Sequence, residues 1–266
     1  MSVNLMKGYD MGLNYIIQEK MNTEVKYIGT VPVKLFTGEK PAKSVLAVHG
    51  FGGSKDSLAI EGLAQRLCDK GFRVAAPDLP CHGERTEKER ELTPERCLSD
   101  ILAVECWLRG LGGEVSAFGT SFGGCLLLKR MELYGNSFRK VALRVPAVNM
   151  ADSLIRCMRL FQPEFTLDAA KQSGFHVKMS RELNIPYEFY SMLLELNEVR
   201  HSDIWDSSDV LAVYAGLDEL VARADTEKFL RLNPHIQRLC IEETGHRMLR
   251  PEHLAQALDR AAEHLV

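Results

Sequence analysis

Six short apolar runs, separated by stretches of helical periodicity, constrain the fold of this 266-residue chain more than any other feature. Most of the runs are apolar nearly throughout, which is typical of strands buried on both faces of a parallel sheet. They cover residues 44–50, 72–78, 114–119, 139–145, 209–216 and 236–242. We therefore expect six buried strands in a sheet that is mostly parallel.

Three of the intervening stretches carry helix signals. Leu63 and Leu67 belong to an apolar stripe that ends at Gly71, a common C-terminal cap. Pro94 and Pro251 each stand where a further helix would begin. The alternation of strands and helices predicts an α/β fold, a doubly wound sheet with helices on both faces.

The alternation lapses between about residues 147 and 207 and resumes at Asp209. Neither end carries a Gly/Ser-rich linker, so we predict a cap insertion within a single domain that spans residues 1–266. Its larger apolar side chains either line a substrate pocket or pack the insertion onto the core. These residues are Leu160, Phe161, Phe165, Phe175, Tyr187, Phe189 and Tyr190. At the other end of the chain, residues 15–29 are compatible with an antiparallel strand pair that starts the sheet.

Composition argues against several classes of protein. The formal net charge of -3 and the lack of a long Lys/Arg run exclude nucleic acid as an expected partner. No apolar run approaches the roughly 20 residues that a membrane helix needs. Lys7 and Asp10 interrupt the apolar N-terminal residues, unlike a signal peptide. Seven scattered cysteines without a C-x-x-C pair fit reduced thiols in a cytoplasmic protein better than a zinc site or a disulfide framework.

A serine stands among glycines directly after the predicted strand 114–119. Residues 119–123 read G-T-S-F-G, a G-x-S-x-G pattern at the junction between a strand and a helix. A sharp turn there would present the hydroxyl of Ser121 outward, and the glycines would leave room for the strained backbone. The alternative is a glycine-rich turn with a capping serine. We favour a nucleophile because partners for it follow other strands.

A nucleophilic serine needs a base, and the base needs an orienting acid. His246 follows the last predicted strand. The histidines set aside are His253 and His264 in the final helix, His176 and His201 in the insertion, and His235 before the last strand. Asp218 follows the strand 209–216 directly, and we prefer it to the neighbouring Glu219 because its reach back to the sheet is shorter. The carboxyl ends of parallel strands share one edge of a sheet, so Ser121, Asp218 and His246 are expected to meet.

Two backbone amides would be needed to bind the oxyanion of an acyl-transfer intermediate. We expect one from Phe122 and the other from Phe51, in the glycine-rich loop after the strand 44–50. His49 is expected to hold this loop by hydrogen bonds. Asp78 and His82 are interpreted as a local brace that satisfies turn amides.

These motifs together resemble the α/β-hydrolase superfamily over nearly the whole chain, from about residue 30. The segments "HGFGG", "PDLPCHGER", "GTSFGG", "GLDELV" and "TGHRM" stand where that superfamily carries its oxyanion loop, Asp-x-x-x-His-Gly loop, nucleophile elbow, acid and histidine. The glycine-rich loop and the position of the insertion look most like small capped serine esterases, including cinnamoyl and feruloyl esterases. The resemblance implies an α/β-hydrolase fold and a triad of Ser121, Asp218 and His246. Dehalogenase and epoxide hydrolase chemistry is disfavoured, because those relatives carry a carboxylate where Ser121 stands.

We expect a serine carboxylesterase that cleaves a small aliphatic or aromatic acyl ester through an acyl-enzyme and needs neither a metal nor an organic cofactor. Acyltransferase, thioesterase and peptidase activities remain open, because the same acyl-enzyme serves them all. A non-catalytic ligand-binding protein is the alternative from another class. The sequence does not determine the oligomeric state, and a homodimer is one candidate.

Overall fold

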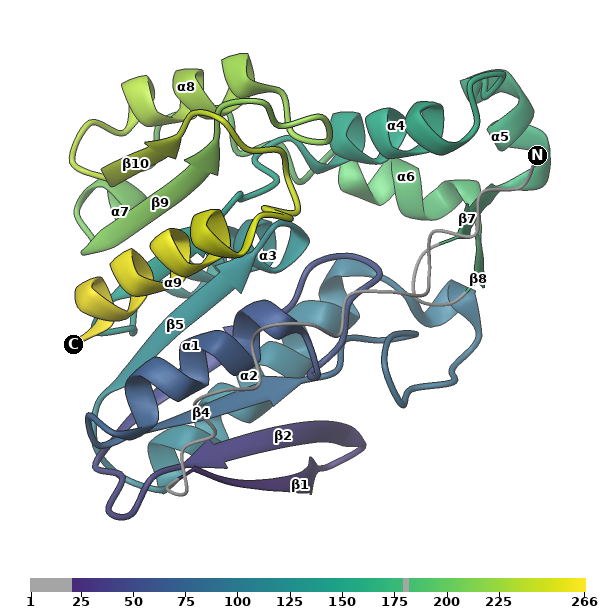
Figure 1. The fold of residues 1–266 in the computed structure, drawn as a ribbon. Helices are drawn as coiled ribbons and strands as arrows, with labels where there is room; N and C mark the ends of the chain where they lie inside the picture. The colour runs from purple at the N-terminus through teal and green to yellow at the C-terminus, as the bar shows by residue number, and fades with distance from the viewer. Residues whose placement is uncertain (1–20, 179–181) are drawn as a thin grey trace.

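A sheet of eight strands runs through the protein, and the computed structural model describes residues 21–178 and 182–266 (Figure 1). Its strands are β1 (Asn22–Ile28), β2 (Val31–Thr37), β3 (Lys43–Val48), β4 (Phe72–Pro77), β5 (Val115–Thr120), β6 (Val141–Arg144), β9 (Val210–Ala215) and β10 (Gln237–Ile241). They lie in the order β1-β2-β4-β3-β5-β6-β9-β10. The predicted α/β-hydrolase fold class is confirmed.

The six apolar runs of the sequence form β3, β4, β5, β6, β9 and β10, and every neighbouring pair among them is parallel. β3, β4, β5, β6 and β9 are covered on both faces, which explains why their runs are apolar nearly throughout. The expectation of a buried strand is wrong for β10, which lies at the edge of the sheet and exposes Gln237 and Arg238. β1 falls within the predicted stretch 15–29, whose first six residues lie outside the described part. Its antiparallel partner is β2, a buried strand that the sequence analysis did not assign.

Helices cover the two faces of the sheet (Figure 1). One face carries α1 (Leu58–Cys68) and α9 (Pro251–Leu265), whose buried side chains share clusters with alternate residues of the strands. The other face carries α2 (Pro94–Gly110), α3 (Phe122–Tyr134) and α8 (Arg223–Leu232). A short 3-10 helix, η1 (Glu89–Glu91), precedes α2. The alternation predicted from the sequence therefore gives a core on each face of one sheet.

The segment between β6 and β9 folds as its own layer beside the carboxyl ends of the strands (Figure 1). It contains α4 (Met150–Phe161), α5 (Leu167–Ser173), the hairpin of β7 (Phe175–Lys178) and β8 (Glu182–Ile185), and α6 (Tyr187–Leu193). α7 (Asp203–Asp206) follows and packs on the core. Its Trp205 is fully buried against Phe229 and donates a hydrogen bond to the carbonyl of Leu128 on α3, at 2.9 Å. The end of the predicted insertion is thus anchored in the core.

All seven cysteines are free thiols. Within the described ranges, no helix has the length and apolar character that crossing a bilayer would require.

Candidate active site

Ser121 occupies a tight corner between β5 and α3. Its backbone has φ 51° and ψ -114°, in the region with positive φ that side chains other than glycine rarely adopt. Its N–H donates to the carbonyl of Arg144 at 2.9 Å, and its carbonyl accepts from the N–H groups of Cys125 and Ala147. The corner therefore holds a strained serine in place through hydrogen bonds on both sides of its backbone.

Two glycines make this corner feasible. A Cβ on Gly119 would come within 2.8 Å of backbone atoms of Gly123 and Gly124. A Cβ on Gly123 would collide with the carbonyl oxygens of Val48 and His49. The glycines flanking the serine therefore allow α3 to pack closely on β5 and β3.

The structure brings His246 and Asp218 to Ser121 from two other loops. His246 Nε2 lies 3.0 Å from Ser121 Oγ, and His246 Nδ1 lies 2.9 Å from Asp218 Oδ2. The N–H groups of Leu220 and Val221 donate to Asp218 Oδ1 at 2.9 and 2.7 Å and fix the carboxylate. The side chains of Asp218 and His246 are 4% and 9% exposed, so their contact is shielded from water.

Glu219, the rival acid in the sequence, has a different contact. Its Oε2 accepts a hydrogen bond from the backbone N–H of His246 at 2.9 Å. Glu219 therefore binds the main chain of the histidine, while Asp218 binds the imidazole.

Arg144 is a site residue that the sequence analysis missed. This last residue of β6 is 6% exposed, and its Nη2 donates to the carbonyls of His246 and Arg247 at 3.4 and 2.9 Å. A charged residue near the end of an otherwise apolar strand run was the signal that could have identified it.

The two amides expected to bind an oxyanion lie beside Ser121. Phe122 provides the first N–H of α3, and Gly50 lies so close that a Cβ on it would be 3.2 Å from Ser121 Cβ. Among the described residues, the N–H groups of Phe51 and Phe122 donate no hydrogen bond within the protein. Their binding of an oxyanion stays a prediction.

Two histidines hold the loop after β3. His49 Nδ1 donates to the carbonyl of Gly50 at 2.8 Å, and its Nε2 accepts from the N–H of Leu79 at 3.1 Å. Burial lowers the pKa of His49 to about 4, although the bond to Gly50 opposes this shift. His82 Nε2 accepts from the N–H of Gly52, and its Nδ1 donates to the carbonyl of Pro80. The predicted role of His49 in holding the loop is confirmed.

Asp78 completes the brace between this loop and the loop after β4. Its carboxylate accepts from the N–H groups of Lys55 and Glu84 at 2.7 and 3.0 Å. The buried ammonium group of Lys55 also lies 3.2 Å from it, a contact that the sequence analysis did not foresee. The interpretation of Asp78 and His82 as a brace that satisfies turn amides is confirmed.

An aromatic cluster joins the insertion to the candidate site. The ring of Phe189, on α6, stacks on Phe51 and meets Phe122 edge-on, with centroids 6.0 and 6.4 Å apart. The other large side chains of the insertion divide into two groups. Phe165, Phe175, Tyr187 and Tyr190 pack on one another, whereas Leu160 and Phe161 are exposed.

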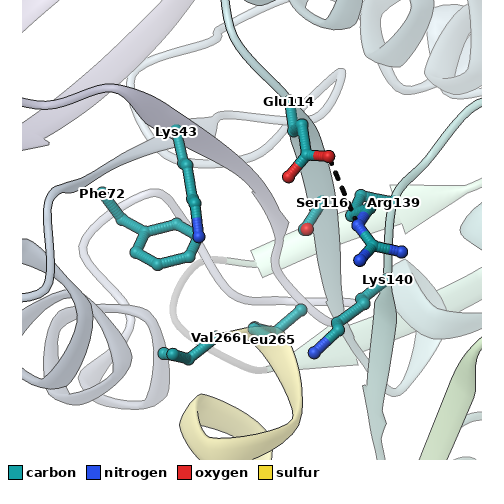
Figure 2. Close-up of a pocket in the computed structure, with 8 residues that line it drawn as sticks. All are labelled: Lys43, Phe72, Glu114, Ser116, Arg139, Lys140, Leu265 and Val266. Atoms are coloured by element: carbon teal, nitrogen blue, oxygen red, sulfur yellow. Dashed lines mark ion pairs between the residues drawn. The ribbon is translucent and has the colours of Figure 1, made fainter.

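Two cavities lie away from the serine. A groove of about 350 Å³ in the insertion is lined by residues of α4 and β7 and by Gln162. Figure 2 shows a small pocket of about 50 Å³ at the amino ends of the strands, where Arg139 pairs with Glu114. In the described part of the chain, no group of three or more His, Cys, Asp or Glu side chains is arranged to hold a metal ion.

Comparison with solved structures gives the same fold at low sequence identity. Est1E from Butyrivibrio proteoclasticus, solved with ferulic acid bound, is 18% identical, with a TM-score of 0.71 over 90% of this chain and 96% of that one. The esterase Pf2001 of Pyrococcus furiosus is 15% identical, with a TM-score of 0.65 over 92% of each chain. The thioesterase domain from the curacin biosynthetic pathway is 18% identical, with a TM-score of 0.61 over 92% of this chain and 99% of that one.

The sequence profile of the alpha/beta hydrolase family matches residues 45–260, which include Ser121, Asp218 and His246. The chain therefore belongs to the alpha/beta hydrolase family.

Proposed function

We propose that the protein is a serine hydrolase that cleaves the carboxylic ester of a small acyl group through an acyl-enzyme. One observation carries the proposal: Ser121 Oγ, the imidazole of His246 and the carboxylate of Asp218 form one chain of hydrogen bonds of 3.0 and 2.9 Å. Such a chain lets the imidazole accept the hydroxyl proton while the carboxylate fixes its tautomer.

In the first half of the reaction, Ser121 Oγ attacks the ester carbonyl carbon and His246 Nε2 takes its proton. The N–H groups of Phe51 and Phe122 bind the oxyanion of the tetrahedral intermediate, and each donor lowers the barrier by roughly 3 kcal/mol. The intermediate collapses, and the alcohol leaves with the proton from His246. Water then attacks the acyl-enzyme by the same proton transfers, which releases the acid and restores the serine.

The aromatic cluster supports a small apolar or aromatic acyl group as the substrate class. Phe51 and Phe122 carry the proposed oxyanion donors, and Phe189 covers both rings from the insertion. Phe122 and Phe189 are buried, so an acyl group bound at Ser121 would meet the partly exposed ring of Phe51, which offers apolar contact and edge-to-face packing. Est1E binds ferulic acid, and we propose a hydroxycinnamoyl ester as one candidate substrate of this protein.

Thioesters are the second candidate substrates, because the curacin thioesterase domain shares this fold. The same acyl-enzyme could also pass to an acceptor alcohol or arise from an amide. The proposed chemistry uses side chains and backbone amides alone and requires no metal or organic cofactor. Seven free thiols support a reducing compartment, and we propose the cytoplasm.

A fluorophosphonate probe and a panel of esters test the proposal. We expect the wild type to be labelled and to hydrolyse short-chain or hydroxycinnamoyl p-nitrophenyl esters, and Ser121→Ala to lose both properties. Ser207→Ala removes an exposed serine hydroxyl at the end of α7, which donates to the carbonyl of Asp203, and serves as the matched control.

A wild-type protein that neither labels nor turns over any ester would refute the serine hydrolase and favour the non-catalytic ligand-binding protein. An alanine variant as active as the wild type would show that another nucleophile acts. Parallel panels of thioesters and of acceptor alcohols separate hydrolase, thioesterase and transferase activities.

A further inference from the structure

The guanidinium group of Arg144 is buried directly beneath the loop that carries His246. Arg144 pairs in register with Val213, whose side chain packs with Met248 and Ala257 on the face covered by α9. It therefore projects into the layer between the sheet and the histidine loop. Burial lowers the pKa of Arg144 to about 10, and the negative charge of Asp218 opposes this effect.

Arg144 has few partners for a buried cation. Its Nη2 donates to the carbonyls of His246 and Arg247, its buried Nε has no hydrogen-bond partner among the described residues, and no carboxylate there lies within 4.0 Å of it. Burying a charge without a direct counter-ion is costly. The burial of this charge under the site therefore indicates a role for Arg144 beyond packing.

The backbone of His246 is also held from the other side. Glu219 Oε2 accepts its N–H at 2.9 Å, and a Cβ on Gly245 would come within 2.6 Å of the same oxygen. Two residues further on, Met248 has φ 51°, a strained value for a side chain of its type. The histidine loop therefore contains a strained residue, and hydrogen bonds hold both the N–H and the carbonyl of His246.

We propose that Arg144 and Glu219 are positioning residues that clamp the main chain of His246 and so hold its imidazole between Asp218 and Ser121. Glu219 binds the N–H before the side chain, and Arg144 binds the carbonyls after it. The negative charge of Asp218 also offsets part of the effect of burial on Arg144. The clamp rests on the proposed function only for its effect on catalysis.

Variants of the two clamp residues test this inference. Glu219→Ala removes the acceptor at an exposed position, and Glu219→Gln keeps an amide oxygen there. Arg144→Met keeps an unbranched apolar stem and removes the guanidinium donors, and Arg144→Lys keeps the charge. Arg139→Met, an exposed arginine at the other end of the sheet (Figure 2), is the matched control.

Steady-state kinetics, melting temperature and the far-downfield Nδ1 proton resonance of His246 are measured for each variant. We expect Glu219→Ala and Arg144→Met to lower kcat roughly 10- to 100-fold with little change in KM, since a misplaced catalytic group costs rate more than binding. The Nδ1 resonance should broaden in both. Glu219→Gln should recover most of the rate, Arg144→Lys part of it, and Arg139→Met should match the wild type.

A wild-type kcat and a sharp Nδ1 resonance in a folded Arg144→Met or Glu219→Ala variant would overturn the clamp. Should Arg144→Met fail to fold, Glu219→Ala and its glutamine rescue decide the question. An inactive wild type would refute the proposed function, and the Nδ1 resonance would then decide on the clamp by itself.

Discussion

Glu198→Gln should remove a marked loss of stability that the wild type undergoes as pH rises from about 4.5 to about 7. Glu198 lies at the junction of the insertion and the core, where its N–H donates to the carbonyl of Val148 and its side chain is fully buried. Arg200 donates to Oε2 at 2.9 Å, but the buried Oε1 has no hydrogen-bond partner among the described residues. Burial raises the pKa of Glu198 from 4.5 to about 7, although the charges of Arg200 and Lys129 oppose the shift.

The sign of the effect follows from the two pKa values. Between pH 4.5 and about 7 the unfolded chain has lost the proton of Glu198 while the folded protein retains it. The free energy of unfolding therefore falls as pH rises through this window, and the loss is complete above the folded pKa. Each tenfold change in proton affinity is worth about 1.4 kcal/mol, so the full loss is roughly 3 kcal/mol.

Urea denaturation of the wild type and Glu198→Gln at several pH values between about 5 and 8.5 measures this difference. Because glutamine stays neutral, the stability of the variant relative to the wild type should rise by roughly 2 to 3 kcal/mol across that range. Glu195→Gln makes the same change at an exposed position three residues away and should follow the wild type. Parallel pH profiles for the wild type and Glu198→Gln would refute the reasoning.

Three further predictions concern the packing around the serine and the core. Gly123→Ala should abolish fluorophosphonate labelling, because its Cβ collides with two carbonyls, whereas Gly110→Ala, which meets nothing within 4 Å, should fold and label normally. The pKa of His49 is lowered to about 4, so acid should destabilise the wild type as pH falls below about 6.5, by up to roughly 3 kcal/mol, and His49→Gln should lack this acid-dependent loss in urea melts. Trp205→Ala should cost roughly 3 to 5 kcal/mol in urea unfolding, and a smaller cost would show that α7 does not anchor the insertion.

Much of the fold follows from local patterns in the sequence. The six apolar runs predicted six parallel strands, because strands covered on both faces are apolar nearly throughout. Five of them are buried, and the edge strand β10 is partly exposed. Helix signals at Pro94 and Pro251 mark the first residues of α2 and α9, since proline is favoured in a first turn. The buried strand β2 was missed because its run contains Pro32 and Lys34, which interrupt the apolar pattern.

Part of the candidate site could also be predicted from the sequence, and part could not. Strand-end placement alone predicted that Ser121, Asp218 and His246 would meet, because the carboxyl ends of parallel strands share one edge. In the sequence, only the shorter distance from the strand end favoured Asp218 over Glu219 as the acid. In the structure, Asp218 binds the imidazole of His246, and Glu219 binds its backbone N–H.

The sequence by itself determined the class of fold and the chemical groups that could react, because periodicity and strand-end position are local properties of the chain. Only the tertiary structure decided which groups support them. Four features depend on contacts between segments far apart in the chain: Arg144 under the histidine loop, Lys55 against Asp78, Phe189 over Phe51, and the buried carboxyl group of Glu198. Burial and long-range contacts determine the charge and the position of these side chains. The spacing of residues along one strand or helix contains no information about either.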